Sequence, residues 1–165
     1  MDPQVGKSPK TADGLSPSIP ENQACDLFTN PQRWEQIVPA DHPHVELEVG
    51  SGKGLFLQVA GAAFPERHYV GIELAAKFAN RAAKRVAKAG LNNVVMLRGD
   101  AQRFLRDVVP DSSLMRLHVY FPDPWWRNKH KKRRVLNDQA LRDIERSLRP
   151  GGELHFWTDV LDYYE

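Results

Sequence analysis

The chain has 165 residues, enough for a single domain, and its 41% hydrophobic and 27% charged residues are typical of a globular protein that can bury a core. The formal net charge of +2 points to no class of partner, and no stretch approaches the ~20 apolar residues of a membrane span. One cysteine, Cys25, cannot close an internal disulfide, and no Cys/His spacing fits a metal site. With no signal-peptide pattern, we expect a cytoplasmic protein without a bound metal.

Residues 1–24 are predicted to be a disordered tail, because they hold too few large apolar side chains to offset the entropy of ordering. The predicted domain covers residues 25–165 and begins with an irregular segment over 26–44. Strands are then predicted over 45–49, 68–73, 94–98, 114–121 and 153–158, and helices over 55–63, 75–89, 101–108 and 136–148, the last stopped by Pro150-Gly151-Gly152. This alternation predicts an α/β fold with a doubly wound, mostly parallel sheet.

The first predicted strand ends in a glycine-rich turn over 48–54, Glu-Val-Gly-Ser-Gly-Lys-Gly. A phosphate-binding P-loop needs glycine where this chain has Leu47, and a dinucleotide loop needs a third glycine where it has Leu55. An acid beside the turn repels a pyrophosphate but suits a cationic ligand with an amino-acid tail, and S-adenosylmethionine is such a ligand. The contacts predicted from this turn are Glu48, Gly50 and Gly52.

Acidic residues also follow the next three predicted strands, where ligands of open α/β sheets bind. Glu73 is placed to accept hydrogen bonds from both ribose hydroxyls of the cofactor, and Asp100, with Ala101, to meet the adenine amino group. Asp123 stands between two prolines in the segment 121–126, Phe-Pro-Asp-Pro-Trp-Trp. The prolines stiffen this turn and would aim the carboxylate of Asp123 into the cleft near the sulfonium.

A basic run follows this turn over 127–134, Arg-Asn-Lys-His-Lys-Lys-Arg-Arg, in which six of eight residues are Lys or Arg. Because it adjoins the predicted site, it suits a polyanionic substrate held through phosphate contacts, which give affinity without sequence choice. We therefore predict that the chain binds nucleic acid.

At these residues the chain resembles the tRNA (guanine-N7-)-methyltransferase family, over roughly residues 45–162. The resemblance rests on five segments: Leu-Glu-Val-Gly-x-Gly-x-Gly over 47–54, Val-Gly-Ile-Glu over 70–73, Phe-Pro-Asp-Pro-Trp over 121–125, Lys-Arg-Arg over 132–134, and Thr158-Asp159. It implies the Rossmann-like fold of S-adenosylmethionine-dependent methyltransferases, with the last two strands missing because the chain stops at Glu165.

The resemblance also implies methyl transfer from S-adenosylmethionine to N7 of a guanosine in the variable loop of tRNA, with S-adenosylhomocysteine as product. It places cofactor contacts at Glu48, Glu73, Asp100 and Asp123, and substrate contacts at Arg127 and Asp159, with Lys132, Arg133 and Arg134 as further tRNA contacts. Asp123 is the predicted catalytic residue, since it would orient the guanine and offset its growing positive charge. The family's usual lysine is replaced here by Arg127, and its C-terminal Thr-x-x-Glu motif does not occur up to Glu165.

Two alternatives stay open at this point. The chain could be a catalytically impaired, RNA-binding fragment of such an enzyme, or a nicotinamide-dependent oxidoreductase, which Leu55 and the Asp-Pro-Trp turn disfavour. A monomer and a homodimer are both compatible with the sequence, and so is an accessory subunit that helps to dock the tRNA.

Overall fold

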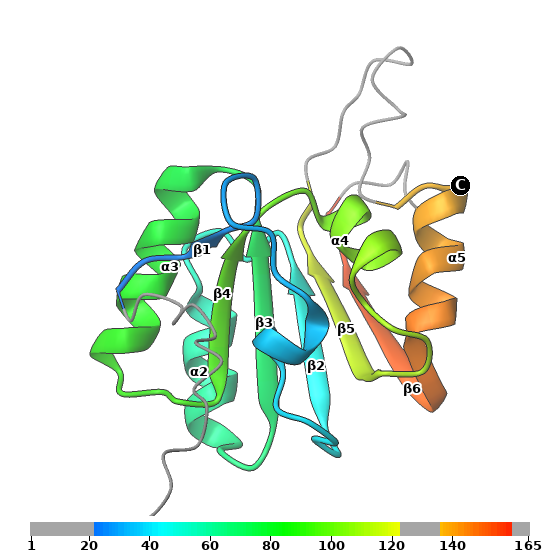
Figure 1. Cartoon of the computed structure of the whole chain (residues 1–165), viewed down its shortest axis with the longest axis horizontal. Helices are drawn as coiled ribbons and strands as arrows, with labels where there is room; N and C mark the ends of the chain where they lie inside the picture. Colours follow the sequence, from blue (N-terminus) through cyan, green and yellow to red (C-terminus); the bar gives the residue numbers. More distant parts are fainter. Residues whose placement is uncertain (1–21, 123–135, 160–165) are drawn as a thin grey trace, which may run out of the picture.

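The computed structural model of the chain describes residues 22–122 and 136–159 (Figure 1). The elements in chain order are β1 (Cys25–Asp26), α1 (Trp34–Ile37), β2 (Val45–Val49), α2 (Leu55–Ala63), β3 (His68–Glu73), α3 (Ala76–Lys88), β4 (Val94–Arg98), α4 (Ala101–Asp107), β5 (Leu114–Tyr120), α5 (Asp138–Ser147) and β6 (Leu148–Trp157). The strands form one sheet in the order β1-β4-β3-β2-β5-β6, and every neighbouring pair is parallel. The predicted doubly wound α/β sheet is confirmed.

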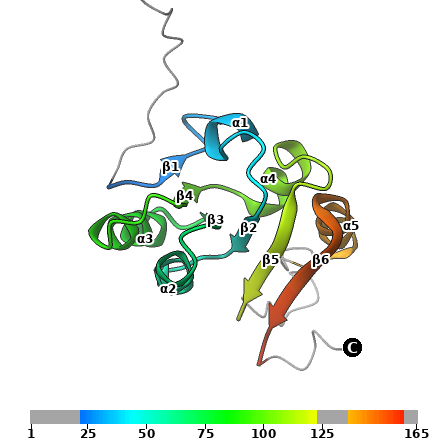
Figure 2. The same ribbon diagram turned by 90° about the horizontal axis from the view of Figure 1, so that it is seen from below.

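Helices cover both faces of this sheet (Figure 2). Helices α2 and α3 lie on one face, and α1, α4 and α5 lie on the other. The sequence of β2 accounts for both packings, because its apolar residues Val45, Leu47 and Val49 belong to the core cluster under α4 and α5. Glu46 and Glu48 alternate with them and point to the opposite face, as period-two strand geometry requires. Both glutamates are nevertheless buried, at 2% and 5% exposed.

Most predicted boundaries agree with the structure. The strands predicted over 45–49, 68–73 and 94–98 and the helix over 55–63 have the observed bounds, and the other helices are shorter by one or two residues at one or both ends. None of the helices within the described residues is long and apolar enough to cross a membrane.

The last strand differs from its prediction. It was expected to begin at Glu153, after a Pro-Gly-Gly stop, but β6 begins at Leu148 and continues through Pro150. Helix α5 has already ended at Ser147, because Leu148 turns to an extended backbone at φ −74° and ψ 138°. A register shift against β5 accommodates Pro150 and the two glycines that follow it, and the strand lies at the sheet edge, where a missing N–H is tolerated.

The segment before β2 is also more ordered than the sequence indicates. Ala24, the last residue of the predicted tail, is buried, and its N–H donates to Oδ1 of Asn80 over 3.2 Å. Cys25–Asp26 then adds a two-residue strand beside β4, and Asp26 forms an ion pair with Arg98. A strand this short has no alternation to reveal it, so only the paired neighbour identifies it. Residues 1–21 lie outside the described residues.

Gly71, in the middle of β3, gives helix α2 room to approach the sheet. A Cβ at this position would lie 2.3 Å from Cδ1 of Leu57 and 2.7 Å from Oγ of Ser51. Leu57 is fully buried, so it cannot move aside without disturbing the core. This contact sets the distance between β3 and the helix that follows the glycine-rich turn.

We expect Gly71→Ala to lower the free energy of unfolding by about 1–3 kcal/mol, the usual cost of overpacking a core. Urea unfolding of Gly71→Ala, Leu57→Ala and the double variant measures it. Because Leu57→Ala removes the nearest clashing atom, the double variant should be more stable than the sum of the two single changes predicts. Simple additivity would show that the close contact does not limit the packing.

Candidate functional site

The strand order brings the predicted acidic residues to one edge of the sheet. β4, β3 and β2 are neighbours, so Asp100, Glu73 and the glycine-rich turn follow adjacent strands at their carboxyl ends (Figure 1). The chain winds from β2 toward β4 with helices on one face, and returns to β5 and β6 with helices on the other. The winding therefore reverses between β2 and β5, the place where open α/β sheets bind ligands.

The glycine-rich turn presents bare backbone to this edge. Gly50 and Gly52 have φ of 76° and 51°, in the left-handed region that favours glycine. The N–H groups of Gly50 and Ser51 both donate to the carbonyl of Ile72, over 2.9 and 3.2 Å, which fixes the turn against β3. A Cβ built on Gly50 or Gly52 would meet no atom within 4 Å. The turn thus leaves open space in which a ligand can approach the backbone.

Glu73 connects the glycine-rich turn to the loop after β3. Its Oε2 accepts the N–H of Gly52 over 3.0 Å, and its Oε1 accepts the N–H of Ala75 over 2.9 Å. Each carboxylate oxygen has further lone pairs, so two backbone bonds do not use up its capacity to accept. The structure therefore brings Glu73 and Gly52 into direct contact, as a ligand bound by both requires.

Glu48 is the most unusual acid of the site. Its Oε2 is buried and has no hydrogen-bond partner in the described part of the chain. Burial first of all, with the negative charge of Glu73 adding to it, raises the pKa of Glu48 to about 7. Such a carboxyl is close to half protonated at neutral pH and gains most from a cationic partner that supplies the missing charge and hydrogen bond.

Asp100 has a structural function in addition to its predicted one. Its Oδ1 caps helix α4 by accepting the N–H groups of Gln102 and Arg103 over 2.9 and 3.1 Å, and Ala101 is the first residue of that helix. Asp100 also borders a cavity of about 350 Å³ between helix α4 and the segment that contains Leu27 and Phe28. Sequence reasoning could not find this cavity, because its two walls lie far apart along the chain.

The remaining predicted residues fall into two groups. Asp159 is exposed just after β6, and the N–H of Phe121 donates to the carbonyl of Trp157 over 2.8 Å, so the ends of β5 and β6 lie side by side. Asp159 is therefore at the same edge of the sheet, two strands from β2. The positions outside the described residues are Asp123, Arg127, Lys132, Arg133 and Arg134.

A buried polar network lies on the same face as Glu48 and was missed by sequence reasoning. Oε2 of Glu46 bonds Nε2 of His118 over 2.7 Å, and Nδ1 of that ring bonds the hydroxyl of Tyr120 over 2.8 Å. Phe56 packs on both rings, with centroids 4.6 and 5.1 Å away. A glutamate within a predicted core strand was a signal that partners are needed, but it could not name partners from another strand.

The network gives Glu46 the opposite electrostatic behaviour to Glu48. Burial by itself would raise the pKa of Glu46, but hydrogen bonds from His118 and His44 and the positive charge of Arg116 lower it to about 2. His44 lies 2.7 Å from Oε1, and Arg67 and Arg116 lie 3.2 and 3.3 Å from the same oxygen. Glu46 is therefore charged and fully paired, and it ties β2 to the strands on either side.

Sheet order, reversal point and glycine-rich turn together define a Rossmann-like, ligand-binding α/β fold. A solved structure of the antibiotic-resistance methyltransferase Kmr is 26% identical, with a TM-score of 0.52 over 70% of this chain and 58% of that chain. The model of a family described as "Putative methyltransferase" matches residues 42–165. The chain belongs to this methyltransferase family.

Curated relatives carry a more specific name. The chain is 52% identical over 130 residues to a "tRNA (guanine-N(7)-)-methyltransferase" of Rhodopirellula baltica. The matched region covers 76% of this chain and 48% of the relative. The chain is 40% identical over 117 residues to a protein of the same name from Hydrogenovibrio crunogenus, covering 71% of this chain and 49% of the relative. The chain thus spans about half the length of these relatives.

We expect Glu46→Gln to destabilise the fold at neutral pH, because the buried bases lose their charged partner. Since the pKa of Glu46 is about 2 when folded and near 4.5 when unfolded, its contribution is present above pH ~4.5 and is lost as pH falls toward 2. Urea unfolding across this range should show the difference between parent and variant shrinking by about 3 kcal/mol. Glu145→Gln, at an exposed position of α5, is the control, and a pH-independent difference would contradict the pairing.

Proposed function

We propose that this chain forms the cofactor-binding part of an enzyme that transfers a methyl group from S-adenosylmethionine to N7 of a guanosine in tRNA, in the variable loop. The observation that carries the proposal is the buried carboxyl of Glu48, whose Oε2 has no hydrogen-bond partner among the described residues, beside an open glycine-rich turn. It occurs in a chain similar to enzymes named for this reaction. The competing nicotinamide-dependent oxidoreductase loses its support, because the chain belongs to a methyltransferase family.

The residues of the site fit S-adenosylmethionine in charge and shape. The buried carboxyl of Glu48 suits the α-ammonium of the amino-acid tail, and Glu73 suits the ribose hydroxyls, since its oxygens keep lone pairs beyond the two backbone bonds. Asp100 keeps Oδ2 for the adenine amino group while Oδ1 caps α4. The open space at Gly50 and Gly52 admits the body of the ligand.

When bound, S-adenosylmethionine supplies a methyl group activated by its sulfonium. The contribution of the chain is alignment, because guanine N7 already presents a lone pair and no proton must be removed before attack. Asp123 orients the guanine and offsets the positive charge that grows on it, and Asp159 holds the guanine edge or a nearby ribose. Arg127 and the basic residues Lys132, Arg133 and Arg134 bind the phosphates of the tRNA.

The pKa of Glu48 gives a test of this fit. Because it is about 7 in the folded chain and near 4.5 in the unfolded chain, the neutral carboxyl favours folding at acid pH, and this contribution is lost as pH rises through 7. Between pH ~5 and ~8 the parent should lose about 3 kcal/mol of unfolding free energy relative to Glu48→Gln. Urea unfolding at both pH values measures this, with Glu145→Gln as control.

Binding of S-adenosylhomocysteine should lower the pKa of Glu48 and so offset the loss of unfolding free energy at high pH. Its ammonium favours the charged carboxylate, so binding near pH 6 should release a proton, and binding near pH 8 should release fewer. Calorimetry in buffers of different ionisation enthalpy counts these protons. Equal proton release at both pH values would show that Glu48 does not bind the ammonium group of the ligand.

The reaction itself is tested by incubating the chain with a tRNA transcript and methyl-labelled S-adenosylmethionine, followed by mapping of 7-methylguanosine. We expect label at a variable-loop guanosine and a loss of at least about 100-fold for Asp123→Ala. Activity of Asp123→Ala within a few-fold of the parent would remove Asp123 from the mechanism. Binding of both cofactor and tRNA without transfer would favour the alternative, a catalytically impaired RNA-binding fragment.

A further inference from the structure

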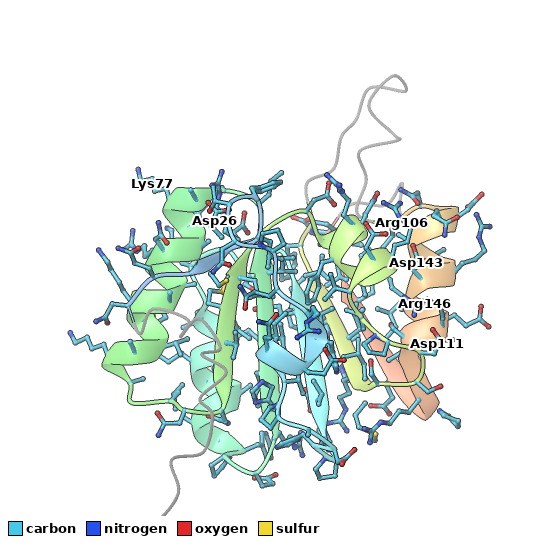
Figure 3. The ribbon with its side chains drawn as sticks, viewed as in Figure 1. Asp26, Lys77, Arg106, Asp111, Asp143 and Arg146 are labelled. Atoms are coloured by element: carbon cyan, nitrogen blue, oxygen red, sulfur yellow. The ribbon has the colours of Figure 1, made fainter. Side chains whose placement is uncertain are left out.

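Helix α3 presents a row of positive charges that no other group in the described residues neutralises. Its exposed cations recur at intervals of four, three and four residues, which places them on one side of the helix. We call this row the cationic stripe; its members are Lys77, Arg81, Lys84 and Lys88. Figure 3 shows Lys77 pointing away from the body of the protein at the upper end of the helix.

The stripe differs from an ordinary solvated helix face. In residues 22–122 and 136–159, none of its four side chains forms a hydrogen bond or ion pair, whereas Arg85 on the inner side of the same helix bonds the carbonyl of Lys53 and the side chain of Gln58. No acidic residue occurs anywhere between Glu73 and Asp100. The positive charge of α3 is therefore uncompensated by its own segment.

Helix α5, which also has an exposed side, differs from α3 in its pattern of charges. Its charged residues are of both signs: the exposed acids Asp138 and Glu145 and the buried acid Asp143 stand beside Arg142 and Arg146. An acid stands in its first turn and a base in its last, in agreement with the helix dipole. Helix α3 has no acid in its first turn and begins instead with a cation, Lys77.

The arrangement works against the stability of α3. Lys77 with Arg81, and Lys84 with Lys88, are like charges four residues apart, and such pairs repel each other on a helix. Lys77 also lies close to the positive end of the helix dipole. The helix holds its place through its inner residues Ala79, Ala82 and Val86, which are buried against the sheet. Lys88 stands in the last turn, where the helix dipole favours a cation, but the other exposed charges are unexplained by folding and suit an external polyanion.

The position of α3 connects the stripe to the site. The N–H of Ala75, just before the helix, donates to Glu73, the predicted ribose contact. The stripe therefore begins at the ligand-binding edge of the sheet and runs down the outer side of the domain for about three turns. A long anionic molecule that reaches the site could lie along it.

We propose that the cationic stripe binds the phosphate backbone of the RNA substrate, as a second contact surface apart from residues 127–134. This inference rests on the proposed function for the identity of the polyanion. Contacts of this kind are independent of base sequence, and each one adds to the salt dependence of binding through the release of counterions.

The test compares two charge-matched variants of the full chain. Arg81→Gln/Lys84→Gln removes two cations from the middle of the stripe, and Arg106→Gln/Arg142→Gln removes two exposed cations from α4 and α5, on the opposite face of the sheet. Binding of a tRNA transcript is measured by fluorescence anisotropy between about 50 and 200 mM KCl. Urea unfolding and S-adenosylhomocysteine titration establish that both variants remain folded and competent for the cofactor.

We expect the stripe variant to bind tRNA roughly tenfold more weakly near 100 mM salt and to lower the slope of log K against log salt by about two. The control variant should change affinity by less than about twofold. Equal losses in the two variants would show an effect of net charge alone and overturn the proposal, as would unchanged binding of the stripe variant or no tRNA binding by the parent.

The outcomes distinguish RNA binding by the cationic stripe from the proposed methyl transfer. Weaker, less salt-dependent binding of the stripe variant supports the surface even if the parent transfers no methyl group. Conversely, a parent that methylates tRNA and a stripe variant with the same KM for tRNA would sustain the reaction and refute the surface.

Discussion

The carboxyl groups of Glu46 and Glu48 are buried on one face of the central strand β2, two residues apart. The structure offsets the cost of burying them in two different ways. Burying an ionised carboxylate costs several kcal/mol unless charges and hydrogen bonds replace the lost water. Glu46 receives both from His44, Arg67, Arg116 and His118. Within the described residues Glu48 receives neither at Oε2, and burial raises its pKa instead. Glu46 holds the sheet together, and Glu48 is the residue that we propose binds a ligand.

The topology of the sheet explains why this difference falls at this place. Glu46 lies within the sheet, where Arg67, just before β3, and Arg116 and His118 of β5 reach it. Glu48 lies at the carboxyl end, where the chain leaves β2 through glycines and the helices change face. The reversal opens the edge of the sheet to ligands, and the same opening removes the neighbours that a buried acid needs. Stability and binding are thus set by one structural feature.

Charged residues are distributed unevenly over the outer surface. The net charge of +2 conceals an uneven distribution, since α3 holds five of the 23 basic residues and none of the 21 acidic ones. Four of those five cations are exposed and have no partner in the part of the chain that the structure describes, and the first of them lies shortly after Glu73. The site edge therefore combines acids that suit a small cationic cofactor with a flank that suits a large anionic substrate. The two ligands that we propose would thus be separated by charge as well as by position.

The sequence by itself determined the fold class, because the alternation of apolar runs and helical patterns is a local signal that survives without knowledge of contacts. It also predicted that Glu48, Glu73, Asp100 and the glycines of the turn lie together, because each stands at or just after the carboxyl end of a strand and the carboxyl ends of parallel strands meet at one edge. Only the tertiary structure decided what Glu46, His118 and Tyr120 do, and that β1 pairs with β4. These depend on residues brought together from distant parts of the chain, and a pKa depends on such neighbours rather than on residue type.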